Sequence, residues 1–489
     1  MNRVAAATLA AVVIALVTAL PSAAQAGTCG GFFQYDADGY TWDFSSPYDY
    51  GMGVIDEGGS SGPGGTPPGP RSGGGDTYDE WGMLFVGGEN AAHAYVQNKN
   101  DVCFDEDEGR ERVFPKLTVD GLEVQRKVYV SPTGLPGARI LNLIHNPSGA
   151  PRTTQVQVGN STDDDVGLFF PGSLGSDDDT RVRFSSDGDA EITAADTWAV
   201  TSDHGSAPAS TNGDFAMAHV FDGAGAADRV DLAALTEDNL TYRWQNVTIP
   251  PGGTVAYLSY EVQQGVADAN GDAEDAAAKN AALAYQAKPL AHIYAGMTDA
   301  EIAAVRNWPR PAPTAAIALA RAAVDRLPVA LTAADSIASP VAGSCSGVAY
   351  SWDLGDGASA DGPEVSHRFS AGAHEVALTV TNSCGESATS RRTIAVRDVT
   401  APTARLRAPR TARVPRISMR VRSSEAGAAS VRLRIGRRTV ARANVRLGAG
   451  AAKRVRLRAN RPGRARVLVT VTDLAGNPVE LSRGIRLRR

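Results

Sequence analysis

Short runs in which apolar and polar residues alternate recur between residues 27 and 310, separated by turn-forming pairs such as Asp120-Gly121 and Asp187-Gly188. Alternation with a period of two places apolar side chains on one face of a β-strand, and turns at short intervals favour antiparallel pairing. We therefore predict that residues 27–310 form a large, many-stranded antiparallel β-sandwich. The predicted strands are Phe32–Tyr35, Met83–Val86, Val124–Val130, Arg139–Ile144, Thr154–Val158 and Val255–Tyr260.

A tract rich in Gly and Pro interrupts this pattern at residues 58–75. It holds no apolar side chain large enough to pack, so we predict a flexible loop between strands. Within it, Gly58–Gly62 matches G-x-S-x-G, the pattern of a hydrolase nucleophile elbow. That elbow requires a strand before the serine and a helix after it, and this tract favours neither. We interpret the match as coincidental.

A short helical tail is predicted at the end of the same region. Residues 272–288 are rich in Ala, and Pro289 ends the run. Thr298 and Glu301 have the spacing of a capping box, in which each side chain accepts a hydrogen bond from the other residue's amide. Trp308 then precedes a Pro-rich segment that reads as a stiff linker.

Residues 311–397 combine strict alternation with a tight-turn signature. The turn lies in Tyr350–Gly357, and a later strand places Val376, Leu378 and Val380 on one face. This set resembles the polycystic-kidney-disease (PKD) repeat domain, whose hallmarks are W-D-x-G-D-G and a G-x-Y-x-V-x-L-x-V-x-N strand. The residues that carry the resemblance are Trp352, Asp353, Gly355, Asp356, Gly357, His367, Phe369 and Asn382.

The PKD resemblance implies a seven-stranded, immunoglobulin-like β-sandwich that serves as an adhesion, spacing or ligand-presenting module. Trp352 is the predicted centre of its core. His374 stands where the family usually has Tyr, which should cost some packing without changing the fold. We predict that Asp353, Asp356 and His367 fix the turn through hydrogen bonds and do not act as acids or bases.

Arg alternates with apolar residues throughout residues 398–489, so one face of each predicted strand is apolar and the other carries guanidinium groups. The segments with this alternation are Ile417–Arg422, Val431–Ile435, Arg454–Arg458 and Ile485–Arg488. Val467–Asn477 resembles the last strands of bacterial Ig-like domains, in which D-x-x-G-N forms the final hairpin. We predict a second small Ig-like β-sandwich here.

The first residues indicate export. Arg3 precedes an unbroken run of small and apolar residues from Val4 to Leu20, and an A-x-A site ends at Ala26. We predict a signal peptide at residues 1–26 and no membrane-spanning segment in the mature chain. The mature protein would be secreted, or associated with the cell surface.

An exported chain with four cysteines is expected to form disulfides, and four cysteines allow three pairings. The long separation of the two closer pairs favours Cys29–Cys103 and Cys345–Cys384. In a PKD-like sandwich the third and sixth strands are antiparallel neighbours, which brings Cys345 and Cys384 to adjacent strand ends. Closing that loop should stabilise the domain by roughly 3–4 kcal/mol.

Residues from about Lys127 to Trp308 also resemble a recurring, uncharacterised domain of bacterial surface proteins. The similar motifs are Arg139–Leu143, Asn146, Gly159-Asn160, Asp196–Trp198, Ala218–Val220, Pro250–Gly253 and Ala303–Trp308. Part of this segment is similar to galactose-mutarotase-like super-sandwiches, a likeness that implies a fold and no catalytic residue.

Charge divides the chain, because residues 27–310 carry 17 Lys/Arg against 42 Asp/Glu, whereas residues 398–489 carry 24 against four. A surface this basic attracts polyanions, which outside a cell are cell-wall polymers, acidic polysaccharides, lipid head groups or extracellular DNA. No Phe, Trp or Tyr follows Phe369, so we expect no specific nucleic acid partner. The alternative is a solvated basic surface, or one that neutralises the acidic region.

Acidic clusters in the N-terminal region offer hard oxygen ligands for a structural calcium ion. They are Asp105–Glu108, Asp163–Asp165, Asp177–Asp179 and the EF-hand-like Asp268-x-Asn270-x-Asp272, which lacks the Gly and Glu of a complete loop. Solvated acidic turns are the simpler interpretation, and we predict no cofactor.

The chain contains no zinc-protease motif, no P-loop and no credible nucleophile elbow. We predict a non-catalytic binding, adhesion or structural protein that engages extracellular polysaccharide or anionic cell-envelope polymer. The alternative is a carbohydrate-processing enzyme with paired carboxylates in a groove of residues 27–310, flanked by aromatic residues such as Trp198 or Trp244. The sequence does not indicate an oligomeric state.

Overall fold

The computed structural model describes residues 25–29, 33–44, 82–96, 101–159, 180–202, 216–236, 239–264, 272–287 and 290–489. Unit 1 comprises Met1–Pro311 with two later segments, Ser339–Ser346 and Ser383–Glu386, and unit 2 comprises the other residues up to Arg489. Outside the described residues lie most of the predicted signal peptide, the 58–75 loop, Asp163–Asp165, Asp177–Asp179, Asp268 and Asn270.

Unit 1 is built on a ten-stranded sheet with the order β1-β5-β6-β8-β9-β16-β13-β12-β11, in which β7 pairs with β8. Its strands are β1 (Gln25–Thr28), β5 (Val102–Glu106), β6 (Glu111–Val113), β7 (Leu117–Val119), β8 (Leu122–Val130), β9 (Ala138–His145), β11 (Arg181–Ser185), β12 (Trp198–Ser202), β13 (Ala216–Val220) and β16 (Thr254–Gln264).

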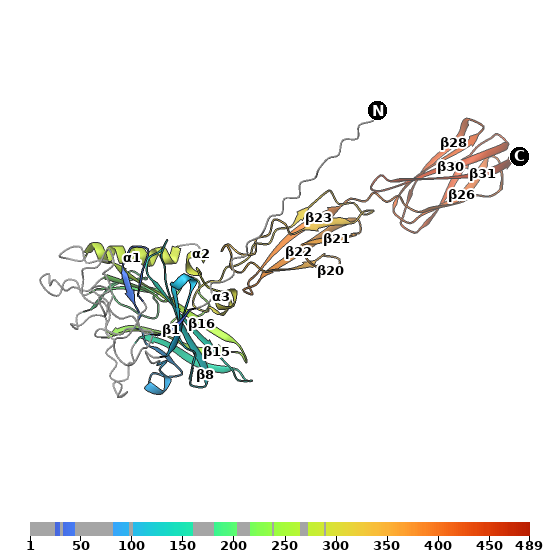
Figure 1. Cartoon of the computed structure of the whole chain (residues 1–489). Coiled ribbons are helices and arrows are strands. Elements are labelled where there is room, and N and C mark those ends of the chain that lie inside the picture. Colours follow the sequence, from blue (N-terminus) through green and yellow to red (C-terminus); the bar gives the residue numbers. More distant parts are fainter. Residues whose placement is uncertain are drawn as a thin grey trace, which may run out of the picture. The chain divides into compact units, whose positions relative to one another are not determined.

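A second sheet of four strands, ordered β14-β15-β10-β4, packs on the first. It contains β4 (Leu84–Val86), β10 (Arg152–Gly159), β14 (Leu232–Thr236) and β15 (Asn239–Ile249), and a separate hairpin joins β2 (Phe33–Tyr35) to β3 (Thr41–Asp43). The predicted large antiparallel sandwich is thus present (Figure 1). Each predicted strand coincides with one of these elements.

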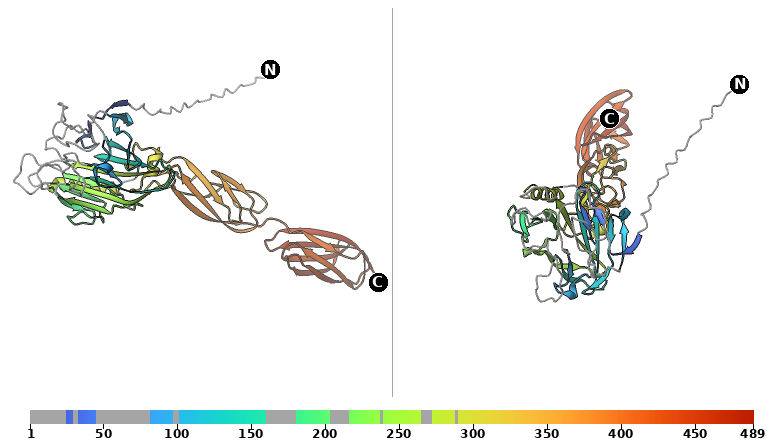
Figure 2. Two further views of the ribbon diagram at one scale, coloured as in Figure 1. Left: turned by 90° about the horizontal axis from the view of Figure 1, so that it is seen from below. Right: turned by 60° about the vertical axis from the view of Figure 1, so that its left-hand side comes forward.

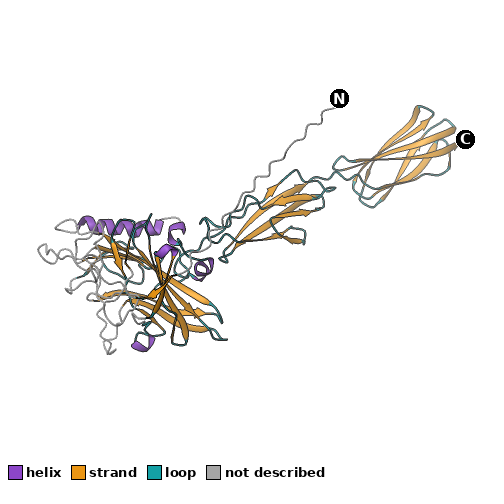
Figure 3. Cartoon of the chain, viewed as in Figure 1, coloured by secondary structure: helices purple, strands orange, loops and turns teal. Residues whose placement is uncertain are grey.

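Both faces of the central strands of the ten-stranded sheet are buried. Along β9, Ile140 and Ile144 belong to a cluster shared with Trp244 of the four-stranded sheet, whereas Leu141 belongs to a cluster on the opposite face. Helices α1 (Asp272–Ala287), α2 (Leu290–Ile293) and α3 (Asp299–Ala304) supply residues to that second cluster. Figure 3 shows these helices along one side of the strands. Among the described residues, unit 1 therefore has two large cores, one on each side of its central sheet, and a small third cluster at Met83 and Phe85.

The helical tail has the predicted form. The amide of Glu301 donates to Thr298 Oγ1 at 3.3 Å, and the amide of Thr298 donates to Glu301 Oε2 at 2.8 Å, which completes the capping box of α3. Trp308 is buried and donates through Nε1 to Leu258 O. Two 3-10 turns lie at Ala91–His93 and Asp107–Gly109. Across the described residues, none of the helices has the length and apolarity needed to span a membrane.

Unit 2 begins with two facing sheets, ordered β17-β18-β21 and β20-β19-β22-β23. Their strands are β17 (Ala318–Leu319), β18 (Val329–Thr332), β19 (Val348–Asp353), β20 (Ser359–Asp361), β21 (Glu364–His367), β22 (Gly372–Asn382) and β23 (Ser387–Val396). Trp352 is 1% exposed, packs in the shared core and donates through Nε1 to Gly362 O. The predicted seven-stranded sandwich and its central Trp352 are confirmed.

A second sandwich follows, with sheets ordered β24-β26-β29 and β25-β31-β30-β27-β28 (Figure 2). The strands are β24 (Ala404–Arg407), β25 (Thr411–Arg413), β26 (Arg416–Ser423), β27 (Gly427–Ile435), β28 (Arg438–Leu447), β29 (Ala452–Arg458), β30 (Gly463–Asp473) and β31 (Pro478–Arg488). Exposed and buried residues alternate strictly along β26, as predicted. One pair, β25 with β31, is parallel. The chain is mainly β.

Candidate functional site

Asp353, Gly355, Asp356 and Gly357 of the PKD signature lie at the turn between β19 and β20, whereas Trp352 lies in β19, His367 in β21 and Asn382 in β22. Asp353 Oδ1 accepts a hydrogen bond from the amide of Gly355 at 2.9 Å. Asp356 Oδ1 accepts one from the amide of Ala358 at 3.2 Å. Both carboxylates therefore satisfy backbone donors of the turn itself, in the manner of Asx turns.

The aromatic part of the signature surrounds Phe369. His367 Nε2 lies 2.7 Å from Asp356 Oδ2, and this hydrogen bond holds the pKa of Asp356 below its usual value. The His367 ring meets Phe369 edge-on with 4.7 Å between centroids, and the His374 ring lies 4.9 Å from Phe369. His374 also donates to Ser370 O at 2.8 Å. The structure thus brings Asp356, His367 and Phe369 together in an arrangement that holds the loop.

Both predicted disulfides are present. Cys29 is bonded to Cys103, and Cys345 to Cys384 with 5.2 Å between their Cα atoms. The loops that carry Cys345 and Cys384 belong to unit 1, where the amide of Cys345 donates to Asp299 Oδ1 at 2.6 Å. Cys345 and Cys384 belong to the core between the ten-stranded sheet and helices α1, α2 and α3, which we call the helix-side core.

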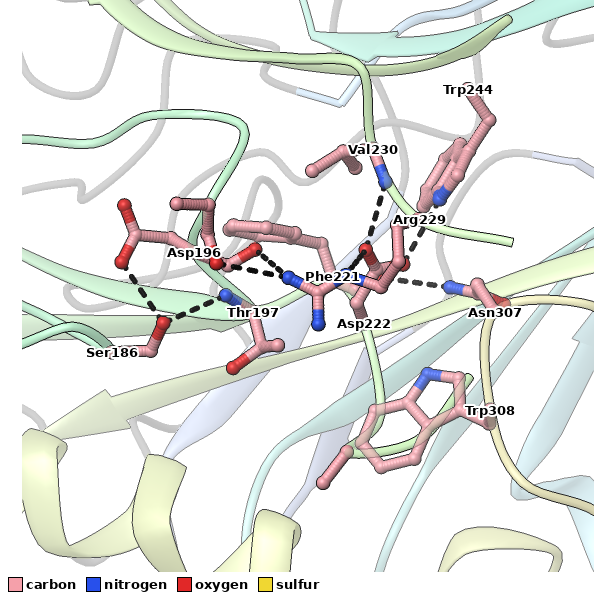
Figure 4. A network of polar contacts seen from close by, with 12 residues as sticks. Ser186, Asp196, Thr197, Phe221, Asp222, Arg229, Val230, Trp244, Asn307 and Trp308 are labelled. Carbon is pink, nitrogen blue, oxygen red and sulfur yellow. Dashed lines mark hydrogen bonds and ion pairs between the residues drawn. The ribbon is translucent and has the colours of Figure 1, made fainter. Parts of the chain in front are cut away.

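A buried carboxylate that sequence reasoning did not single out, Asp222, anchors the centre of unit 1 (Figure 4). It lies two residues after the end of β13 and is fully buried. Asp222 Oδ1 accepts from Trp244 Nε1 at 2.9 Å, and Oδ2 accepts from the amide of Val230 at 2.9 Å. Arg229 Nε lies 3.2 Å from the same Oδ2.

Burial raises the pKa of Asp222 to about 7, against the opposing effects of Val230, Trp244, Arg229 and Asn307. Arg229 extends the network, because its guanidinium also donates to the carbonyl of Asp196 at 2.9 Å. The Asp196 carboxylate in turn accepts from Ser186 Oγ at 2.9 Å (Figure 4). The network ties the loops after β11 and β13 to the four-stranded sheet.

Thr201, His219 and Glu261 stand on the adjacent strands β12, β13 and β16. His219 Nε2 is 2.8 Å from Thr201 Oγ1, and Nδ1 is 2.6 Å from Glu261 Oε2. These distances match a nucleophile, a base and an orienting acid. All three residues are at most 1% exposed, and burial raises the pKa of Glu261. A reacting group must reach its substrate, so this burial favours a structural hydrogen-bond network.

The two tryptophans predicted to flank an enzyme groove are buried. Trp198 is 4% exposed within the helix-side core, and Trp244 is 1% exposed within the core between the sheets. Trp244 packs against Tyr257 with 4.6 Å between ring centroids and against Tyr242 with 5.5 Å. Neither tryptophan presents a ring face to solvent, as a sugar-stacking platform would.

A cluster of five charged residues lies beside β8 and β9. Lys127 Nζ contacts Glu106 at 2.7 Å, Glu111 at 3.4 Å and Glu301 at 2.8 Å. Arg139 binds the other oxygen of Glu111 at 2.8 Å, and both of these side chains are 2% exposed. Burial raises the pKa of Glu111 although both cations oppose it.

Of the acidic clusters considered as calcium ligands in the sequence, Asp105–Glu108 and Asp272 lie among the described residues. Asp105 pairs with Arg112 at 2.6 Å, and Glu106 pairs with Lys127 at 2.7 Å. Asp272 begins α1, where its charge suits the helix N-terminus. Two of the four carboxylates in the Asp105–Glu108 cluster therefore form ion pairs with cationic side chains of the protein.

Another carboxylate group, formed by Asp398, Glu425 and Asp473, lies in unit 2, with ligand atoms within 4.8 Å of one another. Burial and the two neighbouring carboxylates raise the pKa of Glu425. Asn477 Nδ2 donates to Asp473 Oδ2 at 2.9 Å, in the predicted D-x-x-G-N hairpin between β30 and β31. Three carboxylates at this spacing offer the oxygen ligands that a hard cation prefers.

The three-stranded sheet of the last sandwich carries a face of arginines on β24, β26 and β29. Directly opposite pairs are Arg407 with Arg420, Arg420 with Arg454, and Arg416 with Arg458. We call this surface the arginine face. Its residues are Arg405, Arg407, Arg416, Arg420, Arg422, Arg454, Arg456 and Arg458, all exposed. In the described part of the chain, none of them forms an ion pair with a carboxylate.

Residues 310–396 match the family model described as the PKD domain, and the chain therefore contains a PKD domain at the predicted place. No curated protein matches the chain.

Among solved structures, the chain is similar to an engineered protein from a structural genomics consortium, at 15% identity and a TM-score of 0.16, covering 20% of this chain and 22% of that protein. It is similar to a Bacteroides ovatus SGBP-B protein in complex with a mixed-linkage heptasaccharide, at 13% identity and a TM-score of 0.15. That likeness covers 36% of this chain and 44% of that protein. It is also similar to a variant of the three Ig domains I67–I69 of titin, at 11% identity and a TM-score of 0.25. That likeness covers 70% of this chain and 94% of the titin fragment. We draw no function from these values.

Proposed function

We propose that this protein is a secreted or cell-surface-associated, non-catalytic binding protein that engages anionic extracellular polymer through the arginine face. The ligand class is an acidic polysaccharide or another anionic cell-envelope polymer. The PKD domain and the two disulfides are consistent with an extracellular protein, because disulfides persist in oxidising surroundings.

The observation that carries the proposal is the direct cross-strand pairing of like charges. Arg407, Arg420 and Arg454 form one continuous row across three strands. Like charges directly opposite each other destabilise a sheet, so such a row weakens the fold unless anions neutralise it. A flexible polyanion supplies those anions at regular spacing and gains entropy by releasing its counterions.

Two further features favour an acidic polysaccharide or another anionic cell-envelope polymer over a specific nucleic acid. The outward positions of the sheet hold no aromatic side chain on which a base could stack, since no Phe, Trp or Tyr follows Phe369. The opposite sheet repeats the charge, with Arg432 opposite Arg442 and Arg464 opposite Arg486. Charge on both sheets suits a long chain that makes many equivalent contacts.

The non-catalytic part of the proposal rests on burial in unit 1. Its most enzyme-like constellation, Thr201 with His219 and Glu261, is closed to solvent, and Trp198 and Trp244 are core residues. An assay of the full chain against neutral and acidic polysaccharides should therefore detect no release of reducing ends or unsaturated products. Turnover that is lost in His219→Gln would overturn this part.

The binding test uses the full-length mature protein, polygalacturonate as the polyanion and dextran as a neutral control, over a series of NaCl concentrations. We expect binding to polygalacturonate alone, with an affinity that falls linearly with salt on logarithmic axes. Binding that does not change with salt, or equal binding to dextran, would contradict the proposal.

Two variants of equal charge separate the arginine face from net charge. The first replaces four residues of the arginine face by Gln: Arg407, Arg420, Arg454 and Arg456. The control replaces four arginines of the opposite sheet by Gln: Arg432, Arg442, Arg464 and Arg486. We expect the first to weaken binding at least about tenfold more than the control, a difference of about 1.4 kcal/mol. Equal losses would assign binding to diffuse charge.

A further inference from the structure

We propose that the PKD domain binds an extended acidic peptide segment of a partner protein, which adds as a strand to the edge of β23. The site is an open groove of about 550 Å³ between β23 and the segment that follows β17. Pockets of about 300–1,000 Å³ are usual for bound ligands. The proposal goes beyond polymer binding by the arginine face, because the residues that line the groove lie between Leu319 and Arg397.

The first observation is the unpaired edge of β23, the last strand in the sheet order β20-β19-β22-β23 (Figure 1). Arg397, which directly follows β23, donates to Ala323 O at 3.0 Å and accepts from the amide of Asp325 at 3.1 Å. Backbone groups face the same edge at every second residue, so those of Thr393 and Ala395 face this side too. In the described part of the chain, no strand pairs with β23 there. Such an edge is a template for another strand.

The groove exists because the chain after β17 runs apart from β23. Strand β17 ends at Leu319 in the opposite sheet, and the chain reaches the end of β23 only at the bridge between Val324 and Arg397. Arg392 spans the gap at the other end, where its guanidinium donates to Ile317 O at 2.7 Å. A strand rises about 3.4 Å per residue, so the edge from Arg392 to Arg397 is about 17 Å long and matches roughly five residues of an extended peptide.

The charge of the groove favours carboxylates in that peptide. Arg321, Arg392 and Arg397 all line it and are exposed, and none of them forms an ion pair with a described residue. Arg321 donates to Pro328 O and Arg392 to Ile317 O. A guanidinium has five N–H donors, so both side chains keep donors for a ligand. Bonds from Arg to a carboxylate are charge-assisted and often bidentate.

The combination of charge and backbone favours a peptide over a saccharide. Leu319 is half-buried and Ala322 is exposed, and both give the groove apolar surface. An extended peptide offers carboxylates to the arginines and an apolar side chain to this surface. It also carries N–H and C=O groups at the spacing that pairs with an edge strand, which is the basis of strand addition. An acidic saccharide offers the carboxylates without that backbone repeat.

The test measures binding of fluorescent peptides to the full-length mature protein by fluorescence anisotropy at physiological ionic strength. The probe is Val-Asp-Val-Asp-Val-Asp, and Val-Lys-Val-Lys-Val-Lys is the comparison of opposite charge. We expect the acidic peptide to bind and the basic peptide to bind at least about tenfold more weakly. No binding of the acidic peptide, or equal binding of both, would overturn the proposal and leave the arginines as guards of an exposed edge.

Two methylated forms of the acidic peptide test strand pairing separately from charge. One carries N-methyl groups on its Val residues and the other on its Asp residues, so each lacks the N–H groups of one edge only. Pairing with β23 uses a single edge of the peptide, so one form should bind at least about tenfold more weakly than the other. Equal affinities would show that charge alone holds the peptide, which contradicts strand addition.

Two double variants of equal charge locate the groove. Arg321→Gln with Arg397→Gln removes two arginines that line it, and should weaken binding of the acidic peptide at least about tenfold. Arg326→Gln with Arg391→Gln is the control, because both arginines are exposed in the same sandwich and lie outside the groove lining. Equal losses in the two variants would assign the binding to diffuse charge and overturn the site.

A substitution in β23 tests the backbone contact from the side of the protein. Ala395→Pro removes an N–H that faces the groove and not β22, a position at which edge strands tolerate proline. It should weaken peptide binding at least about tenfold in a chain with an unchanged circular dichroism spectrum, whereas Ala395→Ser should change it less than about twofold. Peptide binding that survives Ala395→Pro would contradict pairing with this edge.

Two last measurements separate the groove from the arginine face. The variant with Gln at Arg407, Arg420, Arg454 and Arg456 should keep peptide binding within about twofold, because the groove lining contains none of these residues. Trigalacturonate should not displace the peptide from the full-length protein. Loss of peptide binding in that variant would move the peptide to the arginine face, and displacement by trigalacturonate would make the groove a saccharide site. Either result would overturn the proposal.

Discussion

Trp244 Nε1 donates a hydrogen bond to Asp222 Oδ1 at 2.9 Å, and the exposure of both side chains is at most 1%. The sequence suggested Trp244 as a ring beside an open enzyme groove. Its indole is instead locked by one hydrogen bond and two aromatic neighbours, Tyr242 and Tyr257. The pair therefore belongs to the interior of the sandwich, and its consequences are for stability.

Asp222→Asn should lower the free energy of unfolding of the chain. The amide group of Asn replaces one acceptor oxygen by a donor, which then faces Trp244 Nε1 or the Val230 amide. Loss of one such buried hydrogen bond costs about 1–3 kcal/mol. Thermal denaturation followed by calorimetry measures the loss, and Asp187→Asn, on an exposed turn, is the control. An unchanged melting temperature in Asp222→Asn would contradict the role of the network.

The same variant gives a pH signature. Burial raises the pKa of Asp222 to about 7 from 3.8, so the native state keeps a proton that the unfolded chain releases as the pH rises. The stabilisation from this group is complete below about pH 4 and is lost as the pH approaches about 7. The deficit of Asp222→Asn relative to the wild type should therefore shrink between pH 4.5 and pH 7. A deficit that grows over that range would show that Asp222 is ionised when buried.

Two glycines of the PKD signature should respond differently to Ala. Gly355 has a φ of 73°, and a Cβ there would lie 2.2 Å from Glu375 O. Gly357 has a φ of 89°, but a Cβ there would meet no atom within 4 Å. Gly357→Ala should cost about 1–2 kcal/mol of backbone strain, and Gly355→Ala should cost more because a backbone clash is added. Denaturant unfolding of both variants tests the order, and equal effects would contradict it.

Replacing both Cys345 and Cys384 by Ser should lower the unfolding free energy of the chain by about 3–4 kcal/mol, since the disulfide spans 39 residues. The Cys29→Ser, Cys103→Ser variant retains only the Cys345–Cys384 disulfide. Reducing this variant should cause the same loss of unfolding free energy. Melting temperatures with and without reductant measure both. A double variant as stable as the wild type would mean that the bond adds nothing to the packing of those loops.

Sequence reasoning located the elements whose signal is local. Alternation in Val376–Val380 and in Ile417–Arg422 predicts strands, because burial on one face repeats every second residue. The Thr298–Glu301 capping box was equally readable, since both partners lie within one turn of chain. The PKD signature added the register of β19 on β22, which places Cys345 near Cys384.

The networks of unit 1 had no such signal. Asp222 meets Trp244 and Arg229 only after three strands and their loops have folded together. Arg139 was read as the first residue of an apolar strand, yet its side chain is the buried cation of a five-residue cluster. Charged residues in central strands are rarely buried without partners. An Arg and a Lys within the predicted apolar strands were therefore the available signal for this cluster.

The arginine face sets stability against binding. Arg420 lies directly between Arg407 and Arg454, so its charge meets two like charges across the sheet. Opposed like charges each cost roughly 0.2–1 kcal/mol, and a polar β-branched residue also suits a strand better. Arg420→Thr should therefore raise the melting temperature of the chain at low salt. The gain should shrink as salt screens the repulsion.

The same substitution should weaken polygalacturonate binding and reduce the steepness of its salt dependence by about one charge. Ser418, exposed on the same strand and opposite Arg456, provides the matched control, because Ser418→Thr leaves the charge unchanged. Opposite changes in stability and affinity are expected where a surface is kept for function at a cost to the fold. If Arg420→Thr lowered the melting temperature at low salt, the repulsion would not be the dominant interaction, and the row would have to be neutralised within the protein itself.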